Sequence, residues 1–286
     1  SRPALVWLHG MTDYFFQTHV AEHFAAQGYD FYAVDLRKCG RSRRSGQSWH
    51  YVSDLAFYYV DLNAALDAIP NKEVVFIAHS TGGLIAPLWM DQLRQTDQER
   101  YKRIKGLILN SPWLDMMGVP EFVLTPLKPL LYALGRIAPK TPLPGGNLTA
   151  YGESVHRDFY GEWDFDLRFK PLAGHRKYVG WIAAVFHGFD AIHSGRVDAG
   201  VPILTLQSTR TQLGQPYSDS VNHADVITDV TQTRRWAKEL SIHYTLHPIK
   251  GARHDVFLSL PHPLQEAFSA CDRWLPTVLE APKSSQ

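Results

Sequence analysis

Short apolar runs rich in β-branched residues alternate with longer amphipathic segments in the first part of the chain. This alternation is typical of a parallel β-sheet covered by helices. The strand candidates are Pro3–Leu8, Tyr29–Asp35, Glu73–Ala78 and Ile104–Asn110. The helix candidates between and after them are Gln17–Gln27, Val52–Ala68 and Gly83–Leu93.

The alternation stops near Met116 and returns after Gly188, and the interval is rich in proline, glycine and aromatic residues. An interval of roughly 70 residues is too long for a plain connection. The pattern then predicts strands at Val201–Gln207 and Ile242–His247, and helices at Val230–Leu240 and Pro263–Leu279. We therefore expect one sheet domain, residues 1–115 and 189–286, interrupted by an inserted region at residues 116–188. The tail Ala281–Gln286 is expected to fray.

Composition and charge narrow the classes of partner. The 286 residues carry 29 basic and 28 acidic side chains, which give a net charge of +1. The sequence has no basic stripe of the kind that would predict a nucleic-acid partner. No apolar run has the length of a membrane span. The two cysteines, Cys39 and Cys271, make no disulfide framework. With no visible signal peptide, reduced thiols favour a cytoplasmic location, unless a signal sequence preceded this chain.

The strongest chemical signal is Ser80, which lies in the run Ala78-His79-Ser80-Thr81-Gly82 between a strand candidate and a helix candidate. A sharp strand-to-helix turn forces strained backbone angles on its central residue and admits only small neighbours. The strain would lift the Ser80 hydroxyl out of the fold, where a base and a substrate can reach it. A serine in a turn can also be a simple capping residue, but this context favours a nucleophile.

A serine nucleophile needs a histidine base, which in turn needs an acid to orient it. On this topology the acid follows a late strand and the histidine follows the last strand. His254 lies in a Gly-containing loop directly after the last strand candidate and before the closing helix. Asp225 is the preferred acid and Asp219 is a rival in the same long loop, whereas Asp229 is placed to cap the next helix.

Attack on an ester carbonyl also needs an oxyanion hole, which consists of backbone N–H groups aimed at the developing negative oxygen. Thr81 directly follows the nucleophile and begins a helix, so its N–H is one candidate donor. Met11 follows Gly10 in the loop after the first strand, so its N–H is the other candidate. His9 in that loop is expected to brace the loop and not to react.

Several other features are expected to be structural. The basic run Arg37–Arg44 follows a strand and is interpreted as a solvated loop, with an anionic head group as the alternative ligand. Nothing in the sequence places a base beside Cys39. The scattered histidines and acids lack metal-ligand spacing, and the chemistry set out above requires no metal or organic cofactor.

Six segments, in a fixed order, resemble a known family: His9-Gly10, Asp35–Ser42, Ala78–Gly83, Asn110–Pro112, Ala224–Ile227 and Gly251–His254. They are similar to the α/β-hydrolase superfamily, and within it to the monoacylglycerol lipase and lysophospholipase branch, often labelled serine aminopeptidase-like hydrolases. The resemblance implies a mostly parallel central sheet flanked by helices, with an inserted and largely helical lid. The chain departs from the family pattern at Ala78, where glycine is usual, and in the long loop Ser208–Ala224. The family also usually has two antiparallel strands ahead of the strand that opens this chain.

Carried over by position, the resemblance assigns Ser80 as nucleophile, Asp225 as acid, His254 as base, and Met11 and Thr81 as oxyanion donors. It also makes residues 116–188 the lid over an acyl pocket. Within that region Val119–Ile137 is strongly apolar, and Pro126 and Pro129 predict a short segment followed by a helix that begins at Pro129. The stretch either packs on the core or forms an apolar rim for acyl chains and lipid aggregates. Six aromatic residues are candidates to line the pocket or to fill the core: Trp163, Phe165, Phe169, Tyr178, Trp181 and Phe186.

The expected function is hydrolysis of carboxylic esters, monoacylglycerol or lysophospholipid-like, with medium or long acyl chains, through an acyl-enzyme. The partner is therefore a small-molecule ester or a lipid. Three alternatives stay open: an aminopeptidase, an acyltransferase with the same triad, or a hydrolase fold kept as a non-catalytic scaffold. An aminopeptidase would need an acidic group in the lid to hold a free amine, and the candidates there are Glu153, Glu162, Asp164 and Asp166. The sequence does not predict the oligomeric state.

Overall fold

The fold, seen in a computed structural model that describes residues 2–144 and 148–279, is built on one six-stranded sheet. The strands are β1 (Ala4–Leu8), β2 (Asp30–Val34), β3 (Val74–His79), β4 (Ile104–Asn110), β5 (Ile203–Ser208) and β6 (Tyr244–Ile249). Their order is β2-β1-β3-β4-β5-β6, and every neighbouring pair is parallel. The predicted parallel sheet is confirmed, and all six strands end at the same edge.

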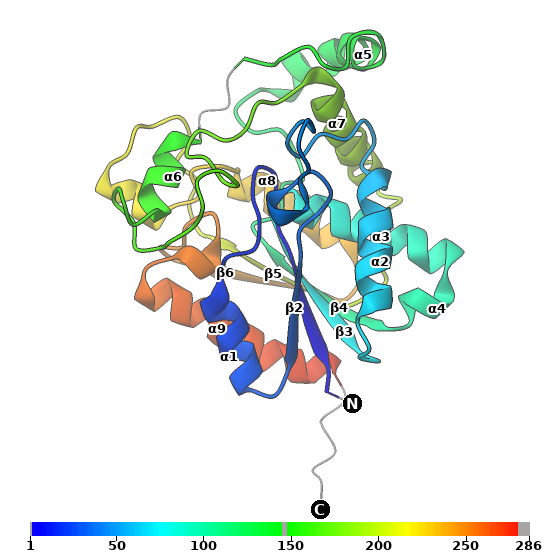
Figure 1. Cartoon of the computed structure of the whole chain (residues 1–286), viewed down its shortest axis with the longest axis vertical. Helices are drawn as coiled ribbons and strands as arrows, with labels where there is room; N and C mark the ends of the chain where they lie inside the picture. Colours follow the sequence, from blue (N-terminus) through cyan, green and yellow to red (C-terminus); the bar gives the residue numbers. More distant parts are fainter. Residues whose placement is uncertain (1, 145–147, 280–286) are drawn as a thin grey trace, which may run out of the picture.

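Helices cover both faces of the sheet (Figure 1). The long helices are α1 (Thr18–Ala26), α2 (Ala56–Ala68), α3 (Gly82–Thr96), α5 (Glu121–Ile137), α7 (Val179–His193) and α9 (Pro261–Val278). The shorter ones are α4 (Gln98–Tyr101), α6 (Thr149–Val155) and α8 (Val230–Ala237). Short 3₁₀ turns complete the order: η1 (Gly40–Ser42), η2 (Asp219–His223), η3 (Lys238–Leu240) and η4 (Val256–Leu258).

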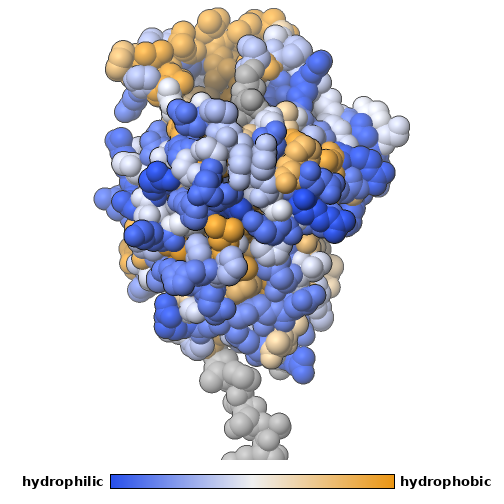
Figure 2. Space-filling view, turned by 90° about the vertical axis from the view of Figure 1, so that its left-hand side faces the viewer, coloured by the Kyte–Doolittle hydropathy of each residue, from blue (hydrophilic) through white to orange (hydrophobic). Residues whose placement is uncertain are grey.

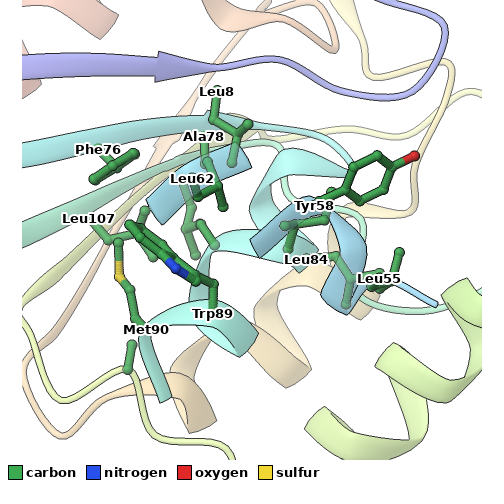
Figure 3. Close-up of a cluster of buried hydrophobic side chains, with 14 of the residues drawn as sticks. Leu8, Leu55, Tyr58, Leu62, Phe76, Ala78, Leu84, Trp89, Met90 and Leu107 are labelled. Carbon is green, nitrogen blue, oxygen red and sulfur yellow. The ribbon is translucent and has the colours of Figure 1, made fainter. Parts of the chain in front are cut away.

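Successive strand residues point to opposite faces of the sheet and feed two separate cores. On one face, Leu5 and Val75 pack with α1 and α9. On the other, Val6 and Phe76 pack with α2, α3 and α7. Figure 3 shows the second core, where Phe76 and Ala78 from β3 meet side chains such as Trp89 from α3. Both faces of the inner strands β1 and β3 are buried, which explains why these two strands are nearly continuous apolar runs.

The region between β4 and β5 adds α5, α6 and α7, which lie beyond the carboxyl-terminal edge of the sheet (Figure 1). α5 and α7 pack against each other, with Gly135 of α5 against Ala183 of α7. α7 continues through Gly188, the expected end of the inserted region, and its buried face joins the core of the sheet domain. The inserted region and the sheet domain therefore share one helix.

The predicted break inside the apolar stretch is wrong, because α5 runs from Glu121 to Ile137 with Pro126 and Pro129 inside it. Each proline lacks an N–H and so frees the carbonyl four residues earlier, that of Phe122 or Thr125. No residue of α5 is buried, so water can hydrogen-bond to these carbonyls. The proline φ angle already suits a helix, and the surface position reduces the cost of the two missing bonds.

Most other predicted elements lie within a few residues of their observed bounds. β6 begins two residues later than predicted, because Ile242 is 90% exposed and lies in the preceding turn. Pro248 is tolerated in β6 because an edge strand can turn one side of its backbone to solvent. No helix among the described residues is long and apolar enough to cross a membrane. The expectation for the tail 281–286 lies outside the described residues.

Candidate active site

Ser80 lies at the turn between β3 and α3 with a φ of 53°, in the left-handed region that residues other than glycine rarely adopt. Its N–H donates to the Asn110 carbonyl at 3.1 Å, and its carbonyl accepts from Gly83 N–H at 2.9 Å and Trp113 N–H at 3.0 Å. Two of these bonds come from the end of β4 and the loop after it, so the neighbouring strand holds the strained turn. The strained backbone predicted for Ser80 is present.

Small residues bring the end of β1 into direct contact with the start of α3. A Cβ atom on Gly82 would lie 2.5 Å from the His9 carbonyl oxygen, and one on Gly10 would lie 3.0 Å from the Ser80 Cβ. Contacts this short leave no room for a larger side chain. The loop after β1 therefore passes directly over Ser80, close to the Thr81 N–H.

His254 and Asp225 form a buried pair, with 2.9 Å between Nδ1 of His254 and Oδ2 of Asp225. An ionised carboxylate only accepts hydrogen bonds, so Nδ1 carries the proton and Nε2 is the basic nitrogen. The two side chains are 3% and 1% exposed. Burial would raise the pKa of Asp225, but His254 and the hydrogen bonds from Thr228 hold this pKa below its ordinary value. The carboxyl therefore stays charged near neutral pH.

Asp225 is held from both its side chain and its backbone. Oδ1 accepts the Ile227 and Thr228 N–H groups at 2.9 and 2.8 Å, and Oδ2 accepts the Thr228 hydroxyl at 2.7 Å. The Asp225 N–H donates to the Arg210 carbonyl at 2.9 Å, and its carbonyl accepts from Gln212 N–H at 2.8 Å. The long loop that begins after Ser208 thus returns to pair with its own start. This pairing holds Asp225 in place although the loop is long.

The other two acids of this segment lie elsewhere. The Asp219 side chain is 91% exposed and lies 3.8 Å from His223. Asp229 caps α8 by accepting the Thr231 N–H at 2.8 Å, as predicted. Of the two acids that the sequence left in question, Asp225 and Asp219, the structure brings only Asp225 to His254.

Charged neighbours on both sides of His254 fix its loop. Arg253 is fully buried, pairs with Glu162 at 2.7 Å and donates to Asn222 Oδ1 at 2.8 Å. Asp255 accepts Asn110 Nδ2 at 2.8 Å and Gln17 Nε2 at 2.9 Å, which ties the loop to the end of β4 and to the start of α1. Asp255, and not His254, caps the turn η4 that follows.

A cavity of about 290 Å³ opens between the carboxyl ends of the strands and the inserted region, and Ser80, His254, Met11 and Thr81 all line it. The remaining lining is Gly10, Thr12, Asp13, His79, Trp113, Met116, Met117, Leu143, Pro144, Leu148, Tyr151, Lys170, Lys177, Ile182 and Ile227. In the described part of the chain, no acceptor takes the Met11 or Thr81 backbone N–H. These two groups are therefore free to bond an oxygen bound above Ser80.

The sequence missed the polar groups of this cavity that come from the inserted region. Lys170 forms an ion pair with Asp13 at 2.9 Å, and the Tyr151 hydroxyl accepts the Asp255 N–H at 3.1 Å beside His254. No pattern in residues 116–188 marks either residue. Thr228, which bonds Asp225, was also missed, although its place three residues after Asp225 suits a local side-chain bond.

The remaining candidates lie outside the cavity. His9 is buried: its Nε2 accepts the Leu36 N–H at 3.0 Å, so its Nδ1 donates to the Gly10 carbonyl at 2.6 Å, and the histidine braces the loop as predicted. In the basic run, Arg37 pairs with Asp61. Burial raises the pKa of the Cys39 thiol, which makes it a poor nucleophile.

None of the six aromatic residues proposed for the pocket lines this cavity, nor do the four acids proposed to hold a free amine. Three of those acids are paired with arginines: Glu162 with Arg253, Asp164 with Arg157 and Asp166 with Arg168. Among residues 2–144 and 148–279, no group of histidines, cysteines and acids is arranged to hold a metal ion.

Comparison with known proteins gives one family match. The model of the family described as "Serine aminopeptidase, S33" matches residues 1–260. No curated protein sequence matches the chain closely enough to count as a relative.

Solved structures share the fold. A monoacylglycerol lipase from Paleococcus ferrophilus superposes with a TM-score of 0.70 at 21% identity, over 98% of this chain and 97% of that one. A soluble variant of the Saccharomyces cerevisiae monoglyceride lipase, in complex with a substrate analogue, gives 0.70 at 18% identity, over 98% and 88%. The mouse α/β-hydrolase domain-containing protein 10 gives 0.60 at 13% identity, over 98% and 92%. These similarities confirm the α/β-hydrolase fold.

Proposed function

Because the chain belongs to the serine aminopeptidase S33 family of hydrolases, we propose that it cleaves carboxylic esters with Ser80 as nucleophile, His254 as base and Asp225 as the acid that orients the base. One observation carries the proposal: His254, which is paired with the buried Asp225, lines the same cavity as the strained Ser80. This arrangement has the chemical parts that acyl transfer to a serine requires.

In the proposed mechanism, Nε2 of His254 takes the proton from the Ser80 hydroxyl as the serine oxygen attacks the ester carbonyl. The Met11 and Thr81 N–H groups stabilise the oxyanion that forms. The C–O bond of the ester then breaks, and the alcohol leaves with the proton from His254. Water, activated by His254, releases the acid from Ser80 in a second half-reaction. No step in this sequence requires a metal or an organic cofactor.

The proposed substrates are esters with medium or long acyl chains, monoacylglycerol or lysophospholipid-like. The cavity supports this choice, because apolar side chains such as Met116, Leu143 and Ile182 supply much of its lining. The similarity in fold to proteins described as monoacylglycerol lipases points the same way. The cytoplasmic location stays a prediction from the sequence.

We further propose that residues 116–188 act as the lid over the acyl pocket and touch lipid aggregates transiently. Figure 2 shows apolar surface gathered at the end of the molecule that carries α5. Its exposed side chains include Phe122 at 81%, Leu130 at 58% and Ile137 at 82%. An apolar surface of this kind, on a helix beyond the cavity, suits contact with clustered ester substrates.

The test is turnover of p-nitrophenyl esters from acetate to palmitate, and of a monoacylglycerol, by the wild type and by Ser80→Ala. We expect faster turnover of octanoyl and longer esters than of acetate, and its loss in Ser80→Ala. Turnover that survives the substitution would refute the nucleophile. A preference for acetate would refute the acyl-chain assignment, and faster cleavage of aminoacyl-naphthylamides would favour the aminopeptidase.

A further inference from the structure

The loop that carries the Met11 N–H is held by a segment far away in the sequence. Three consecutive residues after Met11 each contact the segment 166–175 of the inserted region, here called the clamp segment. Thr12 Oγ1 accepts the His175 N–H at 2.7 Å, and Asp13 Oδ1 accepts Lys170 Nζ at 2.9 Å. The Tyr14 hydroxyl accepts the Asp166 N–H at 2.6 Å.

These contacts are partly buried and lie beside a strained backbone. Thr12 has a φ of 50°, an unfavourable value for a β-branched residue. Such a conformation persists only where the surroundings impose it. Thr12 is 4% exposed, and the Asp13 and Lys170 side chains are 2% and 12% exposed. The hydrogen bonds and the ion pair from the clamp segment are part of the restraint on this loop, together with the contacts of His9.

Asp13 also connects the clamp segment to the residues around Ser80. Its Oδ2 accepts the Gly10 N–H at 3.3 Å, and Gly10 lies against Ser80 and the Thr81 N–H. Burial would raise the pKa of the Asp13 carboxyl, but Lys170, His79 and His9 lower it to about 2. The Asp13 carboxyl is therefore charged at neutral pH, and a movement of Lys170 would move Asp13 and the Met11 N–H beside it.

We propose that the clamp segment sets the geometry of the oxyanion hole, with Asp13, Lys170 and Thr12 as positioning residues for the Met11 N–H. This inference rests on the proposed function. It gives the inserted region a role in the rate of the chemical step, separate from its proposed role as a lid over the acyl chain. A small displacement of a group that stabilises the transition state slows chemistry more than it weakens binding.

The main variant is the double substitution Asp13→Asn/Lys170→Met, which removes the tie without leaving a single buried charge. We expect a kcat on the best ester about 10- to 100-fold below wild type, a KM within about twofold of wild type, and a Tm close to that of the wild type. An unchanged kcat in the folded double variant would overturn the proposal. A raised KM at unchanged kcat would overturn it too, because the pair would then serve substrate binding.

Two substitutions of the uncharged residue Thr12 test the same proposal and leave the Asp13–Lys170 ion pair intact. Thr12→Val removes the acceptor for the His175 N–H and should lower kcat, whereas Thr12→Ser retains the hydroxyl and should retain most of kcat. Equal kcat values for the two would contradict the clamp. Lys128→Met is the matched control, since it breaks another Lys–Asp pair of the inserted region, Lys128–Asp190 at 2.7 Å, and should leave kcat unchanged.

A measurement without substrate separates this inference from the proposed function. Absence of ester turnover in the wild type would refute the proposed function. Hydrogen exchange of the backbone amides of residues 9–16 reports the clamp in either case. We expect faster exchange there in Asp13→Asn/Lys170→Met and in Thr12→Val than in Lys128→Met, and equal exchange would overturn the clamp.

Discussion

The orientation of His254 depends on which oxygen of Asp225 already accepts hydrogen bonds from the backbone. Oδ1 accepts two backbone N–H groups, from Ile227 and Thr228, so only an oxygen fits at that position. Oδ2 is then the atom that faces Nδ1 of His254. The two sides of one carboxylate therefore fix both the loop and the tautomer of the proposed base.

Asp225→Asn should for this reason inactivate the enzyme without displacing the loop. The asparagine oxygen would take the place of Oδ1, and its NH₂ group would face Nδ1 of His254. That nitrogen would have to accept, which puts the proton on Nε2, where it blocks attack by Ser80. We expect ester kcat to fall by about 10³- to 10⁴-fold, measured with Tm as a check of folding.

Asp219→Asn is the control for this prediction, because Asp219 is the exposed rival in the same loop and should leave kcat unchanged. The account of Asp225 would be contradicted if Asp219→Asn lost activity while Asp225→Asn retained it.

A motif with a fixed place in the topology lets the sequence indicate where its residue lies. Ser80 and His254 follow identifiable strands, so the structure brings their side chains to one cavity. The Asp13–Lys170 pair could not be predicted, because its partners are 157 positions apart and Lys170 follows no pattern. Side-chain pairs made by an irregular segment depend on tertiary folding alone.

At the scale of elements, the contact between α3 and β1 places Thr81 and Ser80. The backbone of Gly82 lies against Leu8, the last residue of β1, and His9, the residue after it. A Cβ atom on Gly82 would lie 2.8 Å from the Leu8 carbonyl oxygen and 2.5 Å from that of His9. Backbone carbonyls cannot move aside as a flexible side chain can. α3 can therefore begin this close to β1 only because residue 82 has no side chain.

Gly82→Ala should push α3 away from β1. We expect a loss of about 1–3 kcal/mol in the free energy of unfolding, the usual cost of overpacking, and a lower kcat because the Thr81 N–H moves with the helix. Urea unfolding and ester turnover measure the two effects. Gly46→Ala is the control: no atom lies within 4 Å of its added Cβ, although its φ is +80°, so only backbone strain applies. Wild-type stability and kcat in Gly82→Ala would contradict the close contact.

Element-level prediction depends on how far the periodic signal extends. The inner strands β1 and β3 are predictable because their two buried faces give nearly continuous apolar runs. The continuous helix α5 is mispredicted because proline in the interior of a helix removes a backbone hydrogen bond, whereas on the surface water can replace the bonds lost at Pro126 and Pro129. The sequence did not reveal how exposed that helix would be.

At the scale of the whole molecule, the proposed reacting residues and the wall of the cavity come from different parts of the chain. The loops at the carboxyl edge of the sheet carry Ser80, Asp225 and His254, whereas residues 116–188 supply much of the cavity wall. α7 joins both parts, since it crosses the expected boundary at Gly188. A change in the inserted region can therefore affect the reacting centre through packing, as well as by altering the access of substrate to the cavity.

The most direct test of the central claim is covalent labelling of the native protein with a fluorophosphonate, followed by intact mass spectrometry and peptide mapping. We predict a single adduct on Ser80 that is absent from Ser80→Ala and from heat-unfolded protein, and that forms more slowly in Asp225→Asn. No adduct on the native protein, or an adduct on another residue, would contradict the claim that Ser80 is an activated nucleophile.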